Sequence, residues 1–213
     1  MTGAAPGWWS PTWQAASLLL GYPDARLLGH EPLLRRLVDG LPEPAGGPLG
    51  RFLDHLAGTP LRVLQESYVD TFEHRRRCCL YLTYYAYGDT RKRGMALLRF
   101  KQAYRAAGLE LRSDELPDHL AVVLEFAATG DPAQGRRLLL EHRGGVELLR
   151  LALGDAGSPY ADVVQAVSAT LPPLGGSDRD AVARLVAQGP PAEEVGLQPF
   201  APPEYMPSSG ARP

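Results

Sequence analysis

Signals for the start of an α-helix recur along this chain. Four dipeptides place a capping side chain directly before a proline: Ser10-Pro11, Thr59-Pro60, Asp131-Pro132 and Ser158-Pro159. Such a side chain accepts a hydrogen bond from a free amide of the first turn, and proline suits that turn because its missing N–H would have no partner there. Glycines follow apolar segments at positions typical of helix ends, namely Gly21, Gly58, Gly108 and Gly130. The chain is therefore predicted to be mainly helical.

The predicted helices cover most of the first 170 residues, with a Pro/Gly-rich loop at residues 40–50. They are expected at 10–20, from 24 onward, at 33–38, 49–57, 60–72, 90–107 and 117–128, in two segments between 132 and 158 divided by Gly144-Gly145, and after 159. The stretch Leu80–Tyr87 has the aromatic content of a strand, but a lone strand has nothing to pair with, so a helix is predicted. The 117–128 helix has few polar residues and should lie at the centre of a bundle.

The length of 213 residues and the hydrophobic content of 45% are those of one globular domain. We expect an all-α, single-domain helical bundle over residues 8–171. A Pro/Gly-rich tail at 172–213 should follow, with one short helix at about 178–188 that starts in a capping-box-like Ser177-x-x-Asp180.

The only two cysteines, Cys78 and Cys79, are adjacent. Two cysteines are too few for a disulfide scaffold. As neighbours, they also lack the ligand spacing of a zinc site. No apolar run approaches the roughly 20 residues needed to cross a bilayer, and no secretory signal is visible. The expectation is a soluble, cytoplasmic protein without a metal or another cofactor.

Positive charge is concentrated in one part of the chain. Residues 75–105 contain nine basic residues and one acid, a net charge of +8, which leaves −10 for the rest because the total is −2. The predicted 90–107 helix carries a basic patch of Arg91, Arg93, Arg99 and Arg105. Such asymmetry can indicate an anionic partner, such as a nucleic acid, a phosphate-bearing cofactor or an acidic protein face. A helical nucleic-acid-binding protein that uses residues 75–105 is therefore one hypothesis. The alternative is that these charges pair with the chain's own acids or solvate a helix face.

Motifs for catalysis are weak. The chain has no phosphate-binding loop, dinucleotide fingerprint or nucleophile elbow. Asp118 and His119 are neighbours and suggest part of a catalytic triad in a small enzyme. Adjacent side chains on a helix diverge by about 100°, so Asp118 would not easily orient His119. The protein is therefore not expected to be an enzyme.

Tyrosines cluster just before the basic helix, at Tyr81, Tyr84, Tyr85 and Tyr87. On a helix the first three would share one side. Tyrosine is enriched at binding surfaces, which favours a recognition site. The alternative is that these are core tyrosines whose hydroxyl groups reach the surface.

This region also carries a family resemblance. The stretch from Arg76 to Lys101 (RRCCLYLTYYAYGDTRKRGMALLRFK) resembles the NarJ family, the assembly chaperones or delta subunits of membrane-bound respiratory nitrate reductase. Glu115-Leu-Pro-Asp-His119 and the apolar residues after it fit the same family and match the acid-x-x-Asp-His element of the wider TorD-like redox enzyme maturation chaperones. Three further segments agree: LLLGYPD ending at Asp24, YVDTF ending at Phe72, and GLQPFAPPE ending at Glu204.

The resemblance implies an all-helical protein without catalytic activity. It implies a partner, the nitrate reductase alpha subunit, bound through its N-terminal segment and as the apo-enzyme in the cytoplasm. The molybdenum cofactor would be inserted at that stage, before the complex attaches to the membrane. The recognition surface expected from this resemblance comprises Tyr81, Tyr84, Tyr85, Glu115, Asp118 and His119. The tyrosines would supply apolar area and the acids would orient a basic peptide.

Overall fold

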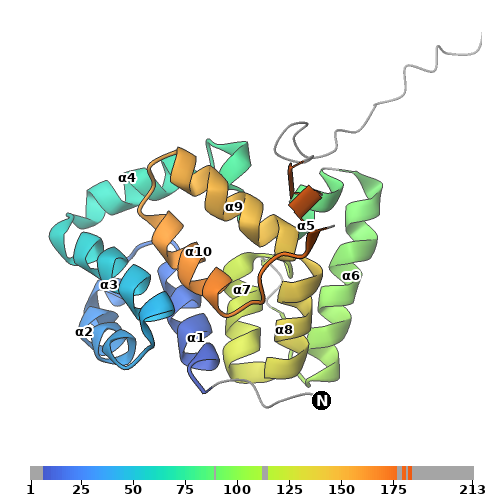
Figure 1. Cartoon of the computed structure of the whole chain (residues 1–213), viewed down its shortest axis with the longest axis horizontal. Coiled ribbons are helices and arrows are strands. Elements are labelled where there is room, and N and C mark those ends of the chain that lie inside the picture. Colours follow the sequence, from blue (N-terminus) through green and yellow to red (C-terminus); the bar gives the residue numbers. More distant parts are fainter. Residues whose placement is uncertain (1–6, 89, 112–114, 177–178, 181, 184–213) are drawn as a thin grey trace, which may run out of the picture.

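The computed structural model describes residues 7–88, 90–111, 115–176, 179–180 and 182–183. Over these residues the protein is all-α, as predicted (Figure 1). The helices are α1 (Trp9–Leu19), α2 (Ala25–Asp39), α3 (Glu43–Gly58), α4 (Leu61–Phe72), α5 (Leu82–Tyr87), α6 (Arg91–Ala106), α7 (Leu120–Glu125), α8 (Pro132–Glu141), α9 (Arg143–Asp155) and α10 (Tyr160–Ala169). A 3-10 turn at Arg76–Cys78 precedes α5, and a π-helical segment at Phe126–Gly130 follows α7.

Two aspartates cap helices with their side chains. Asp131 accepts hydrogen bonds from the amides of Ala133 and Gln134 at 3.0 Å, which confirms the predicted start of α8. Asp24 accepts one from Leu27 N at 2.8 Å. These carboxylates satisfy first-turn amides that have no partner within the helix and lie at its positive end.

Three other predicted caps, at Ser10, Thr59 and Ser158, are not formed, although the helices begin close to the predicted places. α1 begins at Trp9, one residue before the predicted cap. Thr59 Oγ1 lies 3.4 Å from Nδ1 of His55 instead of capping α4. Pro159, not Ser158, occupies the N-cap position of α10. The prolines therefore mark the helix starts better than the residues before them do.

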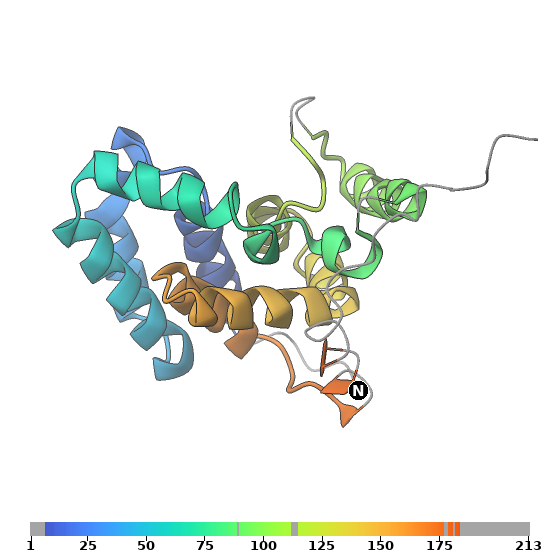
Figure 2. The same cartoon turned by 90° about the horizontal axis from the view of Figure 1, so that it is seen from above.

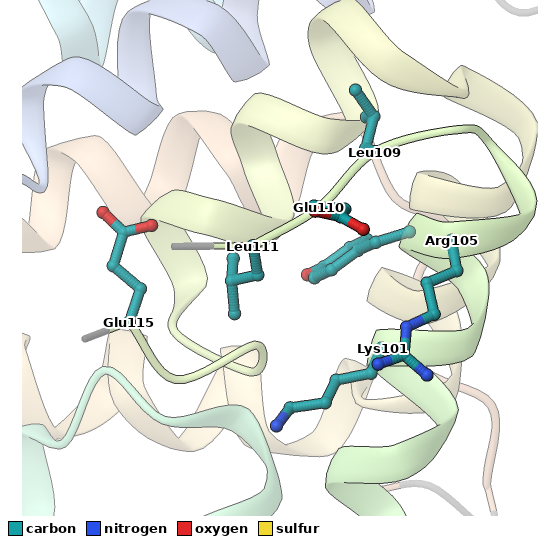
Figure 3. Close-up of a pocket in the computed structure, with 7 residues that line it drawn as sticks. Lys101, Arg105, Leu109, Glu110, Leu111 and Glu115 are labelled. Carbon is teal, nitrogen blue, oxygen red and sulfur yellow. The ribbon is translucent and has the colours of Figure 1, made fainter. Parts of the chain in front are cut away.

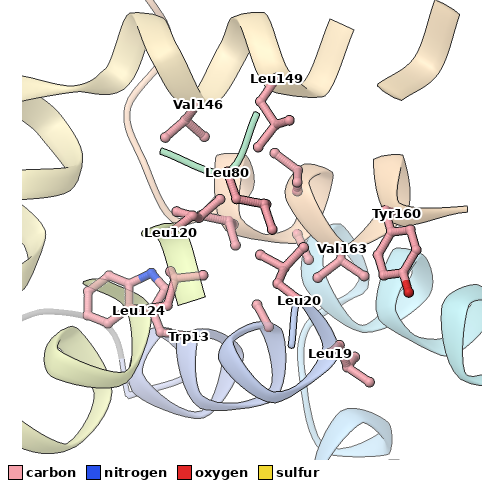
Figure 4. Packing of buried hydrophobic residues seen from close by; sticks show 14 of the residues in the cluster. Trp13, Leu19, Leu20, Leu80, Leu120, Leu124, Val146, Leu149, Tyr160 and Val163 are labelled. Carbon is pink, nitrogen blue, oxygen red and sulfur yellow. The ribbon is translucent and has the colours of Figure 1, made fainter. Parts of the chain in front are cut away.

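The core is built around α1 and α7. α1 packs against α7, α10, α2 and the π-helical segment, while α3 packs against α2 and α10. Trp13 lies fully buried among leucines and valines of α1, α7 and α10 (Figure 4), and its Nε1 donates a hydrogen bond to Thr170 Oγ1 at 2.8 Å. The central position predicted for the apolar helix is confirmed: Leu120, Val123 and Leu124 are all 0% exposed.

The remaining helices flank this core on two sides. Figures 1 and 2 show α2, α3 and α4 on one side, and α5, α6 and α8 on the other. α9 contacts α5, α8 and α10, and so links the two sides.

The predicted loop at residues 40–50 is wrong, because α3 begins at Glu43. Its glycines allow a close approach between helices: a Cβ on Gly46 would lie 3.0 Å from Leu41 O and 3.1 Å from Val38 O. Pro44 lies in the first turn, where no N–H is needed. The predicted break between residues 24 and 33 is also absent, since α2 continues through Pro32 and buries Leu27, Leu34 and Val38.

Two other boundaries differ from the prediction. The break between α8 and α9 falls at His142, and Gly144 and Gly145 lie inside α9. A Cβ on Gly145 would lie 3.2 Å from Leu82 O, so this glycine lets α5 approach α9. The predicted 117–128 helix starts later, at Leu120, and ends in the π-helical segment.

Several expectations lie outside the described residues. These are the cap at Asp89, the capping box at Ser177, most of the short helix at 178–188, and the tail from residue 184 onward.

Candidate functional site

Two segments distant in the sequence meet at one antiparallel β-bridge, between Tyr81 and His119. Leu82 N donates to Asp118 O at 3.0 Å, and Leu120 N donates to Leu80 O at 2.8 Å. The bridge places the residues just before α5 beside those just before α7. The stretch predicted as one helix over 80–87 is therefore extended at its start and helical only from Leu82.

Asp118 lies behind this bridge and is 0% exposed. Its Oδ2 accepts hydrogen bonds from Thr83 N at 3.1 Å and Thr83 Oγ1 at 2.5 Å. The guanidinium of Arg93 reaches in from α6: Nε donates to Thr83 Oγ1 at 3.1 Å, and Nη2 lies 3.8 Å from Asp118 Oδ2. A buried carboxylate thus ties α5, α6 and α7 together through a charge-assisted network.

The side chains of Tyr81 and His119 cover this network and are partly exposed. Their rings meet edge to face, with centroids 5.4 Å apart, and Arg93 lies 5.5 Å from the Tyr81 ring centroid. Burial raises the pKa of Tyr81 and lowers the pKa of His119; the Asp118 charge opposes the second shift. Both groups are therefore neutral near pH 7, which suits contact with an apolar partner.

The other two tyrosines of the predicted surface point elsewhere. Tyr85 is 5% exposed, and its hydroxyl donates to the carbonyl oxygens of Arg77 at 3.0 Å and Cys79 at 2.8 Å. Tyr84 is partly exposed and meets the Tyr85 ring edge to face. The prediction that Tyr81, Tyr84 and Tyr85 share one helix face is wrong, because Tyr81 precedes the helix.

Glu115 belongs to a separate pocket. The pocket has a volume of about 260 Å³ and is lined by Lys101, Tyr104, Arg105, Leu109, Glu110, Leu111 and Glu115. In Figure 3, Lys101 and Arg105 extend from α6, while the acids come from the chain that follows it. The Tyr104 hydroxyl donates to Pro117 O at 2.5 Å, which fixes the inner wall.

The predicted basic patch is divided by the fold. Arg91, Arg99 and Arg105 are exposed on α6. Arg93 does not join them, because its side chain turns inward to Thr83 and Asp118 and is only 17% exposed.

Glu73, an exposed residue at the end of α4, is an acid near this site that the sequence did not suggest. Burial raises the pKa of Tyr81 and of Tyr68, and the charge of Glu73 makes the smallest of the contributions in the same direction. No spacing motif links Glu73 to Tyr81, so only the fold could reveal this electrostatic interaction.

The arrangement does not have the geometry of a catalytic dyad. Asp118 Oδ2 is committed to Thr83, whereas the His119 ring packs on Tyr81. Within the described ranges, no group of three or more His, Cys, Asp or Glu side chains could hold a metal ion. None of the helices described is long and apolar enough to span a membrane.

The all-helical fold places the chain among the redox enzyme maturation proteins. It matches the crystal structure of a protein described as a redox enzyme maturation protein from Archaeoglobus fulgidus, with a TM-score of 0.58 and 25% sequence identity. The match covers 75% of this chain and 91% of that protein.

The chain belongs to the nitrate reductase delta subunit family, which it matches over residues 38–165. NarJ of Bacillus subtilis, named as a nitrate reductase molybdenum cofactor assembly chaperone, is 31% identical over 77% of this chain and 90% of its own length. NarJ of Escherichia coli, with the same description, is 32% identical over 68% of this chain and 63% of its own length.

A third relative is longer than this chain. The nitrate reductase-like protein NarX of Mycobacterium tuberculosis is 47% identical over 76% of this chain, but the match spans only 24% of NarX. The NarJ relatives are chaperones rather than enzymes by name, and the comparisons give no support to the nucleic-acid-binding hypothesis.

Proposed function

We propose that this protein is a dedicated chaperone for the nitrate reductase alpha subunit. It binds the N-terminal segment of that subunit and the apo-enzyme in the cytoplasm, and it supports molybdenum cofactor insertion and complex assembly before the enzyme attaches to the membrane. Family membership and the names of the NarJ relatives support this role.

The observation that carries the proposal is the partly exposed Tyr81–His119 pair above the buried Asp118. Two neutral rings offer apolar area to a peptide, and a buried ion network holds them in place before the partner arrives. Preorganised aromatic side chains contribute much of the affinity at protein interfaces.

The six residues predicted for recognition divide into those that can contact the client and those that position the surface. Tyr81 and His119 contact the client; Tyr84, which is partly exposed, and Glu115, which is exposed, lie apart from this pair and can contact it as well. Asp118 and Tyr85 are buried, so they position the surface rather than touch the peptide.

Calorimetry with the N-terminal peptide of the alpha subunit tests this site. Tyr81→Ala and His119→Ala should each weaken binding about tenfold or more, because both remove contact area at the centre of the surface. Leu33→Ala is the matched control, since Leu33 is an exposed apolar residue on α2. Unchanged affinity in folded Tyr81→Ala and His119→Ala variants would remove the pair from the site.

The role itself is tested in cells that lack the protein. The alpha subunit should accumulate but contain little molybdenum and reduce little nitrate, and the wild-type chain should restore both. Full molybdenum content in the deletion strain, with no second chaperone present, would refute the role independently of the peptide measurements.

A further inference from the structure

The orientation of α6 is fixed by its inward face. Ala96, Phe100 and Tyr104 are buried, and the Phe100 ring lies 5.0 Å from the ring of His142. Tyr104 is held by its hydrogen bond to Pro117 O, and Arg93 by its bond to Thr83. Because these contacts occupy one side of the helix, the opposite side faces solvent along its whole length.

The outward face of α6 combines basic and apolar side chains. The helix contains six basic residues and no acid. Met95 is 69% exposed and Leu98 is 48% exposed, and the two lie on the same face, three residues apart. Lys92 and Arg99 flank them on one side and are also exposed.

Throughout the part of the chain that the structure describes, no carboxylate forms an ion pair with Lys92, Arg99, Lys101 or Arg105. Lys101 and Arg105 share their pocket with Glu110 and Glu115, so Lys92 and Arg99 are the cations that flank the apolar pair. Met95 and Leu98 together form an exposed apolar pair flanked by cations, and exposed apolar patches rimmed by polar residues mark interaction sites.

We propose that this face of α6 binds reversibly to the surface of a bilayer rich in anionic lipids. α6 lies at the outer edge of the described fold in both views (Figures 1 and 2), so its exposed side is turned away from the other helices. Peptides are usually held in grooves between elements, whereas a single basic helix face with exposed apolar side chains matches helices that lie in the membrane interface. Met95 and Leu98 enter the headgroup region, and the flanking cations contact lipid phosphates.

Two apolar side chains give little insertion, so the attachment depends mainly on charge. It is therefore expected to be weak, reversible and sensitive to salt. This surface is separate from the Tyr81–His119 surface, so either proposal can fail without the other.

Co-sedimentation of the full chain with vesicles tests the inference. The wild-type protein should bind vesicles of mixed phosphatidylglycerol and phosphatidylcholine at low salt, but not vesicles of pure phosphatidylcholine. Lys92→Glu/Arg99→Glu should lower the partition coefficient at least about tenfold, since each basic residue near an anionic surface contributes to binding. Met95→Ser/Leu98→Ser should lower it less, and 0.5 M salt should abolish it, as the Debye length falls to about 4 Å.

The control is Leu33→Ser/Arg36→Glu, which changes an exposed leucine and an exposed arginine on α2. It should bind like the wild type. Absent binding to anionic vesicles, or equal binding by the α6 variants, would overturn the inference. Binding to polyglutamate or duplex DNA without binding to vesicles would overturn it too, and would assign the face to an acidic macromolecule.

Discussion

The carboxylate of Asp118 accepts two hydrogen bonds from Thr83, at 3.1 Å from the amide and 2.5 Å from the hydroxyl group. Both residues are 0% exposed. Tyr81 occupies the N-cap position of α5, but its side chain does not cap the helix. Asp118, 35 residues away in sequence, instead accepts the hydrogen bond from the first-turn amide of Thr83. The Asp-His element thus caps α5 from a distant part of the same chain, while the His119 side chain stays partly exposed.

Replacement of Asp118 should weaken the fold. Asp118→Ala leaves the buried amide and hydroxyl group of Thr83 without an acceptor and removes a carboxylate close to Arg93, so the free energy of unfolding should fall by about 2–4 kcal/mol. Asp118→Asn should cost less, because its amide oxygen can still accept from Thr83. Thermal unfolding measures both, and the exposed Asp39→Ala should stay within about 0.5 kcal/mol of the wild type. Equal midpoints for Asp118→Ala and wild type would contradict the capping role.

The tyrosines of α5 should differ in what they do. Tyr85→Phe leaves the carbonyl oxygens of Arg77 and Cys79 without this donor, which should lower stability by about 1–2 kcal/mol. Tyr84→Phe should cost less than Tyr85→Phe, because the Tyr84 side chain is partly exposed. Urea unfolding measures the free energy of unfolding of both variants, and the larger loss should fall on the buried tyrosine, Tyr85. A larger loss for Tyr84→Phe than for Tyr85→Phe would contradict the assignment.

Gly135 should not tolerate a side chain. A Cβ there would lie 2.4 Å from Cα and Cβ of Ala127, so α8 and the π-helical segment would have to separate. Gly135→Ala should destabilise the fold by about 1–3 kcal/mol. Gly154→Ala is the matched variant: it meets no atom within 4 Å and should stabilise α9 by up to about 1 kcal/mol through helix propensity. If Gly135→Ala raises the unfolding midpoint or leaves it unchanged, the close approach at Gly135 is not as tight as the structure shows.

Stability should decrease as the pH falls below about 6.5. Burial lowers the pKa of His119 and of His142, with nearby carboxylates opposing both shifts. Both histidines therefore bind a proton more readily in the unfolded chain, so stability is full above the unfolded pKa of about 6.5 and is lost as the pH drops toward the lowered folded value. The double variant His119→Gln/His142→Gln should show a flatter pH profile of thermal midpoints between about pH 7 and 5. An equally steep profile for the double variant would contradict the assignment.

The predictions that succeeded rest on local signals. Helix starts at prolines and the central place of the apolar 120–125 segment depend on residues close together in sequence, because capping and amphipathic periodicity act within a few turns. The predictions at 40–50 and at Gly144-Gly145 failed for a complementary reason. A glycine indicates a loop only where a turn needs its wide range of backbone angles. At Gly46 and Gly145 the missing side chain instead lets two backbone segments approach each other.

The sequence by itself determined the helical class, the positions of most helices, the family and the motif that contains Asp118 and His119. Only the tertiary structure decided which side chains of that motif face solvent. Periodicity describes one helix at a time, whereas the Tyr81–His119 bridge, the Thr83–Asp118 hydrogen bonds and the inward turn of Arg93 each join residues from different elements. Such pairings depend on how the apolar faces of all the helices pack together, and no local pattern encodes that arrangement.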